Sequence, residues 1–181
     1  MVYIYPRTSL LPAHKNRKTN KTTPPRTLGA KTTDIEIQKQ VTLDYTLAAA
    51  TALSASRAPA PQPLRFVFAS GILAVRDQSK SVWFGSGARH IKGEAETRLL
   101  DFSAAHRDSF DAFIVRPGMV MESAGGVGGV AVWAGVPAVS VQGLAAVMVE
   151  LAVRGGGEKV WENRELGGRG RELLKRGEAR A

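Results

Sequence analysis

The chain has 181 residues, of which 44% are hydrophobic and 23% are charged, the size and composition of one folded domain. It contains no cysteine, which excludes disulfides, thiolate metal sites and a cysteine nucleophile. The histidines lie far apart without ligand spacing, which argues against a histidine metal site (His14, His90 and His106).

The formal net charge of +9 is concentrated at the N-terminus. Residues 1–33 hold seven lysines and arginines and no acidic residue, which leaves 18 basic against 16 acidic residues elsewhere. A nucleic-acid-binding domain carries its charge on the folded part. The sequence therefore predicts a basic disordered tail over residues 1–33, a domain over residues 34–181 and no specific nucleic-acid partner. An organelle-targeting peptide, a polyanion-binding arm and an N-terminus foreign to the fold are the alternatives for the tail. Unless the tail is a targeting peptide, we expect a cytoplasmic protein.

Two elements are predicted in the first half of the domain. Residues 34–56 favour a helix, with Asp34 as its N-cap, and the proline-rich residues 57–63 end it. Residues 64–70, "LRFVFAS", form a short continuous apolar run, which is typical of a strand buried on both faces.

A second helix is predicted over residues 88–106, where apolar residues recur at three- and four-residue steps (Ile91, Ala95, Leu99 and Phe102). On its polar side, Glu94 and Arg98 have the spacing of a favourable ion pair. Residues 111–121, "DAFIVRPGMVM", then predict a second strand that is halted near Pro117 and Gly118.

The uncharged run over residues 123–149 is 27 residues long, enough to span a bilayer. Its glycines and proline disfavour a spanning helix, so we expect a loop, a short strand at residues 138–142 and a helix at residues 144–153, with a membrane span as the alternative. A turn at residues 155–159 and a polar helix at residues 163–176 follow. The alternation of strands and helices predicts the α/β class with a parallel sheet.

Candidate site residues lie where the predicted strands end. Ser70 ends the first strand, Pro117 and Gly118 end the second, and Lys92 lies in the first turns of the helix between them. Ligands of open parallel sheets bind at the carboxyl ends of the strands. We therefore expect Ser70, Lys92 and the Pro117–Gly118 turn to converge. The alternative for Lys92 is a solvated surface lysine that pairs with Glu96.

Three segments, "RFVFASG", "IKGEAETRLLDF" and "FIVRPGMVM", occur in the order found in a known family. Over roughly residues 27–176 the chain resembles the C-terminal half of the short-chain dehydrogenase/reductase superfamily, and in particular its atypical, epimerase-like members. The resemblance implies a partial Rossmann-like, doubly wound parallel sheet that lacks the N-terminal strands and binds NAD or NADP together with a small-molecule substrate.

The resemblance also implies roles for individual residues. Lys92 matches the family's lysine, which bonds the nicotinamide ribose and lowers the pKa of a tyrosine four residues earlier. Ser70 matches, to within one position, the serine that orients the substrate carbonyl. We thus expect Ser70 and Lys92 as catalytic residues, and a cofactor contact surface at the end of the second strand (Lys92, Pro117, Gly118 and Val120).

The chain departs from the family pattern in two places. Ala88 stands four residues before Lys92, where the family has its proton-donating tyrosine, and the tyrosines lie elsewhere (Tyr3, Tyr5 and Tyr45). Residues 1–33 contain a single glycine, Gly29, and no glycine-rich phosphate loop. The run Gly126–Ala131 satisfies G-x-G-x-x-A, but a flexible loop on the substrate side is the preferred interpretation because no helix clearly follows it.

Two hypotheses of function follow. In the first, the chain is an NAD(P)-binding protein of the oxidoreductase or nucleotide-sugar-epimerase-like type, truncated and with impaired or absent catalysis. In the second, it is a non-catalytic binding or regulatory relative of that family. In either case we expect weak or lost cofactor binding, and possible self-association through an uncovered edge of the sheet.

Overall fold

A computed structural model describes residues 34–56, 61–122 and 137–178 of the chain. The expected tail and the Gly126–Ala131 motif lie outside these residues. The elements follow in chain order as α1 (Ile35–Lys39), η1, a π-helical turn (Gln40–Asp44), α2 (Tyr45–Ser56), β1 (Leu64–Ala69), α3 (Ser86–Ala105), β2 (Phe110–Arg116), β3 (Met119–Met121), β4 (Ala138–Ser140), α5 (Val141–Arg154), β5 (Val160–Glu162) and α6 (Asn163–Glu178).

The main sheet has three parallel strands in the order β1–β2–β5. Leu64 of β1 lies opposite Phe110 of β2, and Ile114 of β2 lies opposite Val160 of β5. The α/β class is confirmed, as is the prediction that residues 64–70 and the strand beginning near Asp111 are parallel neighbours. Strands β3 and β4 form a separate parallel pair.

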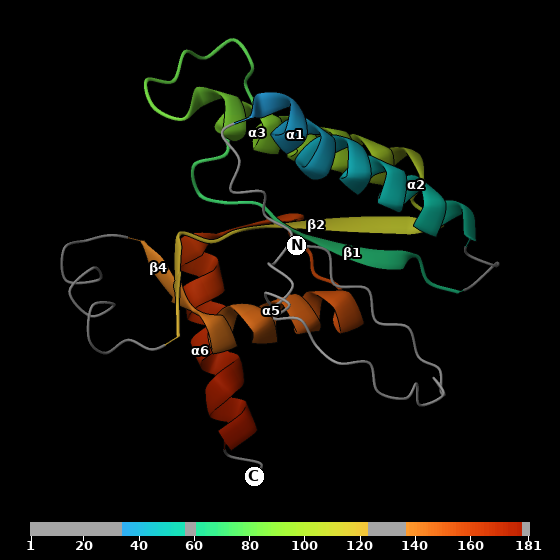
Figure 1. Ribbon diagram of the computed structural model, residues 1–181. Helices are drawn as coiled ribbons and strands as arrows, with labels where there is room; N and C mark the ends of the chain where they lie inside the picture. Colours follow the sequence, from blue (N-terminus) through green and yellow to red (C-terminus); the bar gives the residue numbers. More distant parts are fainter. Residues whose placement is uncertain (1–33, 57–60, 123–136, 179–181) are drawn as a thin grey trace, which may run out of the picture.

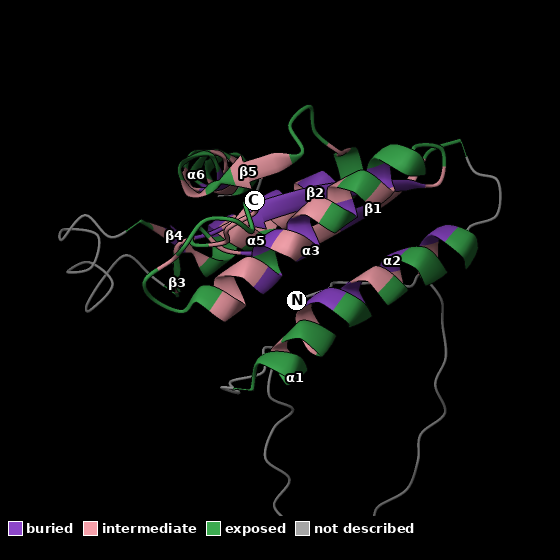
Figure 2. Ribbon diagram, turned by 90° about the horizontal axis from the view of Figure 1, so that it is seen from above, coloured by how far each residue is buried: buried purple, intermediate pink, exposed green. Residues whose placement is uncertain are grey.

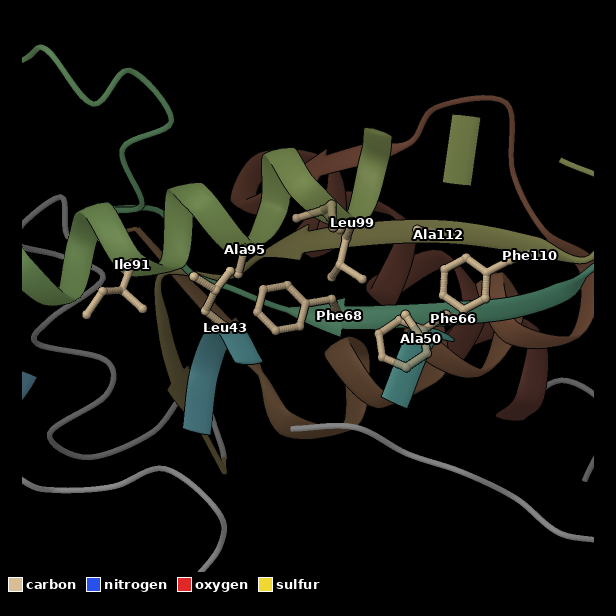
Figure 3. Packing of buried hydrophobic residues seen from close by; sticks show 10 residues of the cluster. Leu43, Ala50, Phe66, Phe68, Ile91, Ala95, Leu99, Phe110 and Ala112 are labelled. Atoms are coloured by element: carbon tan, nitrogen blue, oxygen red, sulfur yellow. The ribbon is translucent and has the colours of Figure 1, made fainter. Parts of the chain in front are cut away.

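One face of the sheet is covered by α1, α2 and α3 (Figure 1). Three phenylalanines of the strands pack here against aliphatic residues of the helices (Figure 3). The rings of Phe66 and Phe110 lie 5.4 Å apart between centroids. The helical stripe predicted from Ile91, Ala95 and Leu99 is buried against them, as the three- and four-residue spacing requires.

The opposite face is covered by α5 and α6, which lie on the other side of the sheet in Figure 1. Phe113 and Val115 alternate with Ala112 and Ile114 along β2, so this central strand sends apolar side chains to both layers. Figure 2 shows the resulting band of buried residues along β1 and β2. The sheet is thus a central layer between two helical layers.

The first helical segment begins as predicted. The Asp34 carboxylate accepts a hydrogen bond of 2.9 Å from the backbone N–H of Glu36, which caps α1. The π-helical turn η1 separates α1 from α2, which the sequence analysis did not predict.

The strands differ from the sequence prediction in two ways. The predicted strand 111–121 is divided, because Pro117 has no N–H to continue the ladder, and residues beyond it join β4 in the second sheet. Strand β5 was not predicted at all. Its three residues are too few to show a periodicity, and they add to β2 at residues Ile114, Val115 and Arg116.

The long uncharged run is described from residue 137 onward. There it forms β4 and the first part of α5, which confirms the predicted strand and helix, although α5 begins three residues earlier than expected. Within the described ranges, no helix has both the length and the apolar character needed to cross a membrane.

Helices α5 and α6 cross at a pair of glycines. A Cβ atom placed on Gly170 would lie 2.8 Å from the Gly143 Cα, closer than two packed carbons can come. An ion pair between Glu150 and Arg169 joins the same helices, with Arg169 Nε donating to Glu150 Oε2 at 2.7 Å. This hydrogen bond lowers the pKa of the Glu150 carboxyl. The contact between Gly170 and Gly143 leaves no room for a side chain at Gly170, so the close crossing of α5 and α6 requires glycine there.

We expect Gly170→Ala to destabilise the protein by about 1–3 kcal/mol, because the added methyl group forces the two backbones apart. Gly168→Ala is the matched control, since a Cβ there meets nothing within 4 Å and the same helix gains up to about 1 kcal/mol from alanine. Urea unfolding of both variants measures the difference. Equal effects of the two substitutions would contradict the close crossing.

Candidate functional site

The chain segments that leave β1 and β2 run side by side. Ser70 donates its backbone N–H to the Val115 carbonyl at 2.9 Å, and Ile72 donates to the Pro117 carbonyl at 3.0 Å. These bonds continue the parallel ladder three residues beyond the end of β1, to Ile72. The carboxyl ends of the two strands therefore form one continuous backbone surface.

Lys92 reaches this surface from α3. A Cβ atom placed on Gly71 would lie 3.7 Å from Lys92 Nζ and 3.9 Å from the Pro117 carbonyl oxygen. Lys92 itself is exposed to solvent. The structure thus brings the Lys92 ammonium group, Gly71 and Pro117 to one place, and a binding role for this group stays a prediction.

Ser70 lies next to Gly71 with only 8% of its surface exposed. Its hydroxyl oxygen is fully buried, and among the described residues it makes no hydrogen bond. A buried hydroxyl without a partner is uncommon in folded proteins, because it loses its bonds to water without replacing them. The catalytic role predicted for Ser70 is untested by this arrangement.

Glu96 lies one turn after Lys92 on α3 and is completely buried. It accepts hydrogen bonds from Arg76 Nε at 2.7 Å and from Arg116 Nη2 at 2.7 Å. Arg76 comes from the loop after β1, and Arg116 is the last residue of β2. Charge-assisted bonds from two arginines offset the cost of burying the carboxylate.

Arg116 continues this network toward β5. Its Nη1 donates to Glu162 at 3.0 Å, and its Nη2 also reaches the Ala74 carbonyl at 3.5 Å. The hydrogen bonds to Glu96 raise the pKa of the Arg116 guanidinium, against the opposing effect of burial. The Glu96 carboxylate thus joins helix α3 to the loop after β1 and to the end of β2. Arg116 extends this network to Glu162 at the end of β5.

Lys92 is exposed, as in the alternative of a solvated surface lysine, but the pairing with Glu96 that this alternative included is wrong. The i,i+4 spacing is right for such a pair, but Glu96 faces the sheet and is occupied by Arg76 and Arg116. The predicted Glu94–Arg98 pair is confirmed at 2.6 Å. The sequence did not reveal the buried network, although a glutamate among the apolar residues of a helix is a signal for one.

Gly93 lets the loop after β1 lie directly on α3. A Cβ atom at this position would lie 1.8 Å from the Val75 carbonyl oxygen, far closer than a non-bonded carbon and oxygen can approach. The Val75 N–H in turn donates to the Arg89 carbonyl at 3.0 Å. This contact places Arg76 within reach of Glu96, so the glycine of the lysine–glycine–glutamate sequence has a packing role.

The remaining predicted cofactor residues lie in the connection to the second sheet. Gly118 donates its N–H to Asn163 Oδ1 at 2.7 Å, and a Cβ atom on it would lie 2.1 Å from the Pro137 carbonyl oxygen. Val120 lies in β3 opposite Val139 and is 44% exposed. Gly118 is therefore needed for packing against Pro137, and Asn163 is a site neighbour that sequence reasoning missed.

Ala88 lies in the first turn of α3, partly buried. Its methyl group offers no proton to a ligand. Tyr45, the tyrosine within the described ranges, lies at the start of α2 with 56% of its surface exposed. Lys92 thus provides an ammonium group at the strand ends, whereas Ala88, four residues before it, carries no phenol.

Comparisons of the chain with protein-family models, with curated proteins and with solved structures gave no match.

The buried network yields a stability prediction. Replacing Glu96 by glutamine keeps its size but leaves two arginines facing a neutral amide, so we expect Glu96→Gln to lower the free energy of unfolding by about 3 kcal/mol. Glu94→Gln on the same helix removes an exposed pair and should cost less than about 0.5 kcal/mol. Denaturant unfolding distinguishes them. A loss below 1 kcal/mol for Glu96→Gln would show that the network is dispensable.

Proposed function

We propose that this chain is an NAD(P)-binding protein of the short-chain dehydrogenase/reductase type, with a partial Rossmann-like fold and impaired catalysis. The observation that carries the proposal is the position of Lys92 Nζ beside Gly71 and the Pro117 carbonyl, at the carboxyl ends of two parallel strands. Ligands of open α/β sheets bind at such ends.

The chemistry of the site suits a polar ligand with oxygen acceptors. An exposed ammonium group donates up to three hydrogen bonds and attracts negative charge, so Lys92 can bond ribose hydroxyls or a phosphate. The backbone at Gly71 carries no side chain that would keep a ligand away from the strand ends. The Ser70 hydroxyl, unpartnered among the described residues, is a second group within this neighbourhood.

Impaired catalysis follows from Ala88. In the family that the chain resembles, a tyrosine at this position exchanges a proton with the substrate oxygen, and the nearby lysine favours its ionised form. With alanine there, Lys92 retains a binding function and has no phenol to activate. A non-catalytic binding or regulatory role is the alternative form of this proposal, and it is favoured by the same substitution.

Binding should be weak. One hydrogen bond from a charged group contributes about 1.5–3 kcal/mol, whereas micromolar affinity needs about 8 kcal/mol. We expect a dissociation constant of about 1 mM for NAD or NADP, and an increase of at least about fivefold in Lys92→Met, since the ammonium group supplies the main polar contact. Ligand-observed NMR titration measures both values.

Lys175→Met is the control for that titration, because Lys175 is also an exposed lysine on a helix and lies in the last turn of α6. Its affinity should equal that of the unmodified chain. Equal affinities for Lys92→Met and the unmodified chain would overturn the proposed site. Micromolar binding with dehydrogenase turnover would overturn the proposed loss of catalysis.

A further inference from the structure

The loop between β1 and α3, called here the aromatic loop (residues 70–85), carries two neighbouring aromatic side chains on its surface. Trp83 is fully exposed and Phe84 is 83% exposed. Neither ring belongs to the hydrophobic clusters that the described residues form. Figure 1 shows the loop, in green, projecting from the molecule ahead of α3. An adjacent pair of exposed rings is stabilised by any contact that removes it from water, so it marks an interaction site.

Hydrogen bonds fix the ends of the aromatic loop to α3. Arg89 Nε donates to the Leu73 carbonyl at 2.8 Å, and Arg89 Nη1 donates to the Phe84 carbonyl at 3.3 Å. Gly85 follows in the left-handed conformation, with φ of 60°, and turns the chain into α3. The backbone at both ends of the loop is thus bonded to one arginine, and the aromatic pair is presented from a braced segment.

The excess positive charge of the chain is attached at the same end of the molecule. A Cβ atom placed on Gly87, just after the aromatic loop, would overlap the Ile35 side chain, so α1 begins beside this loop. Residues 1–33, with seven lysines and arginines and no acidic residue, join the chain directly before α1. The loop and the start of α3 add Lys80, Arg89 and Lys92. These cations outnumber the acidic residues of the loop and of α1 with its cap, which are Asp77, Asp34 and Glu36.

The small area of the aromatic pair favours one kind of partner. Two aromatic side chains bury about 400 Å² together, whereas each side of a stable protein–protein interface buries about 800 Å². A bilayer needs no surface of complementary shape, because aromatic rings enter it singly at the level of the lipid headgroups. Anionic headgroups also attract the nearby lysines and arginines. A membrane surface that contains anionic lipids therefore suits this loop better than a protein partner does.

We propose that the aromatic loop is a peripheral membrane anchor, in which Trp83 and Phe84 enter the interface of a bilayer that contains anionic lipids. Lys80, three residues before Trp83 and exposed, contacts the lipid phosphates. Two rings bury little apolar area, so binding is reversible and depends on the added attraction between the cations and the headgroups. This anchor does not depend on the proposed binding of a dinucleotide.

Flotation of the full chain with vesicles of phosphatidylcholine and phosphatidylserine tests the anchor. We expect the chain to bind, and Trp83→Ser combined with Phe84→Ser to weaken binding at least about tenfold, because partitioning grows with the apolar area that enters the bilayer. Tyr45→Ser is the control, since it replaces another exposed aromatic residue, at the start of α2, and should leave binding unchanged. Both variants keep residues 1–33, so undiminished binding of the double variant would assign it to the basic segment and overturn the proposal.

The contribution of the loop cation is measured in the same assay. We expect Lys80→Gln to weaken binding to the anionic vesicles about fivefold, because a lysine at the surface of an anionic bilayer is attracted to it. Lys175→Gln is the matched control, since α6 lies on the other side of the sheet (Figure 1) and its exposed lysine should not face the bilayer. Equal effects of the two substitutions would show that the attraction is not local to the aromatic loop, contrary to the proposal.

A fluorescent label identifies the part of the chain that enters the bilayer. Because the chain contains no cysteine, Ser81→Cys can carry an environment-sensitive dye two residues from Trp83 while both rings are kept. We expect anionic vesicles to increase its emission and to shift it to shorter wavelength. The same dye at Thr51→Cys, an exposed position on α2, should not respond.

Two results with the labelled chain would overturn the anchor. An apolar environment of the dye at position 81 before vesicles are added would show that another part of the chain, or a second copy, covers the aromatic loop. Binding of single-stranded DNA that is lost in the Trp83→Ser, Phe84→Ser variant, without a response of the dye to vesicles, would assign the rings to base stacking instead.

Discussion

A single buried carboxylate holds together the part of the structure where the strands end. Glu96 accepts bonds from Arg76 and Arg116, and Arg116 also binds Glu162 beside β5. Since a buried carboxylate is tolerated only when such partners surround it, the loop after β1 and the end of β2 are both fixed relative to α3. Lys92, one turn earlier on the same helix, is thereby placed over the strand ends.

The sequence was sufficient for the main elements of the fold. The continuous apolar run "LRFVFAS" is typical of a buried strand, and the three- and four-residue spacing of Ile91, Ala95 and Leu99 is that of an amphipathic helix. The structure confirms both. Strand β5 was missed because three residues carry no periodicity. The alternative interpretation of Lys92 paired it with Glu96 because their i,i+4 spacing is a local signal, whereas the partners of Glu96 in the structure are 20 positions away on either side.

The candidate site was predictable only in part, for a related reason. Parallel strands bring their carboxyl ends to one edge, so the meeting of Lys92 with Gly71 and Pro117 follows from the order of elements. The packing roles of Gly93 and Gly118 do not follow from it, because they depend on where the Val75 and Pro137 carbonyls lie. Gly93 and Gly118 are thus explained by packing, whether or not the strand ends bind a ligand.

The most direct test of the account is to map a bound dinucleotide onto the chain by amide chemical shifts during titration with NADP. The account predicts concentration-dependent shifts centred on Gly71, Lys92 and Gly118, all of which lie at the carboxyl ends of β1 and β2. Shifts centred on α6, or no shifts at millimolar NADP, would contradict the claim that this edge of the sheet is a binding site.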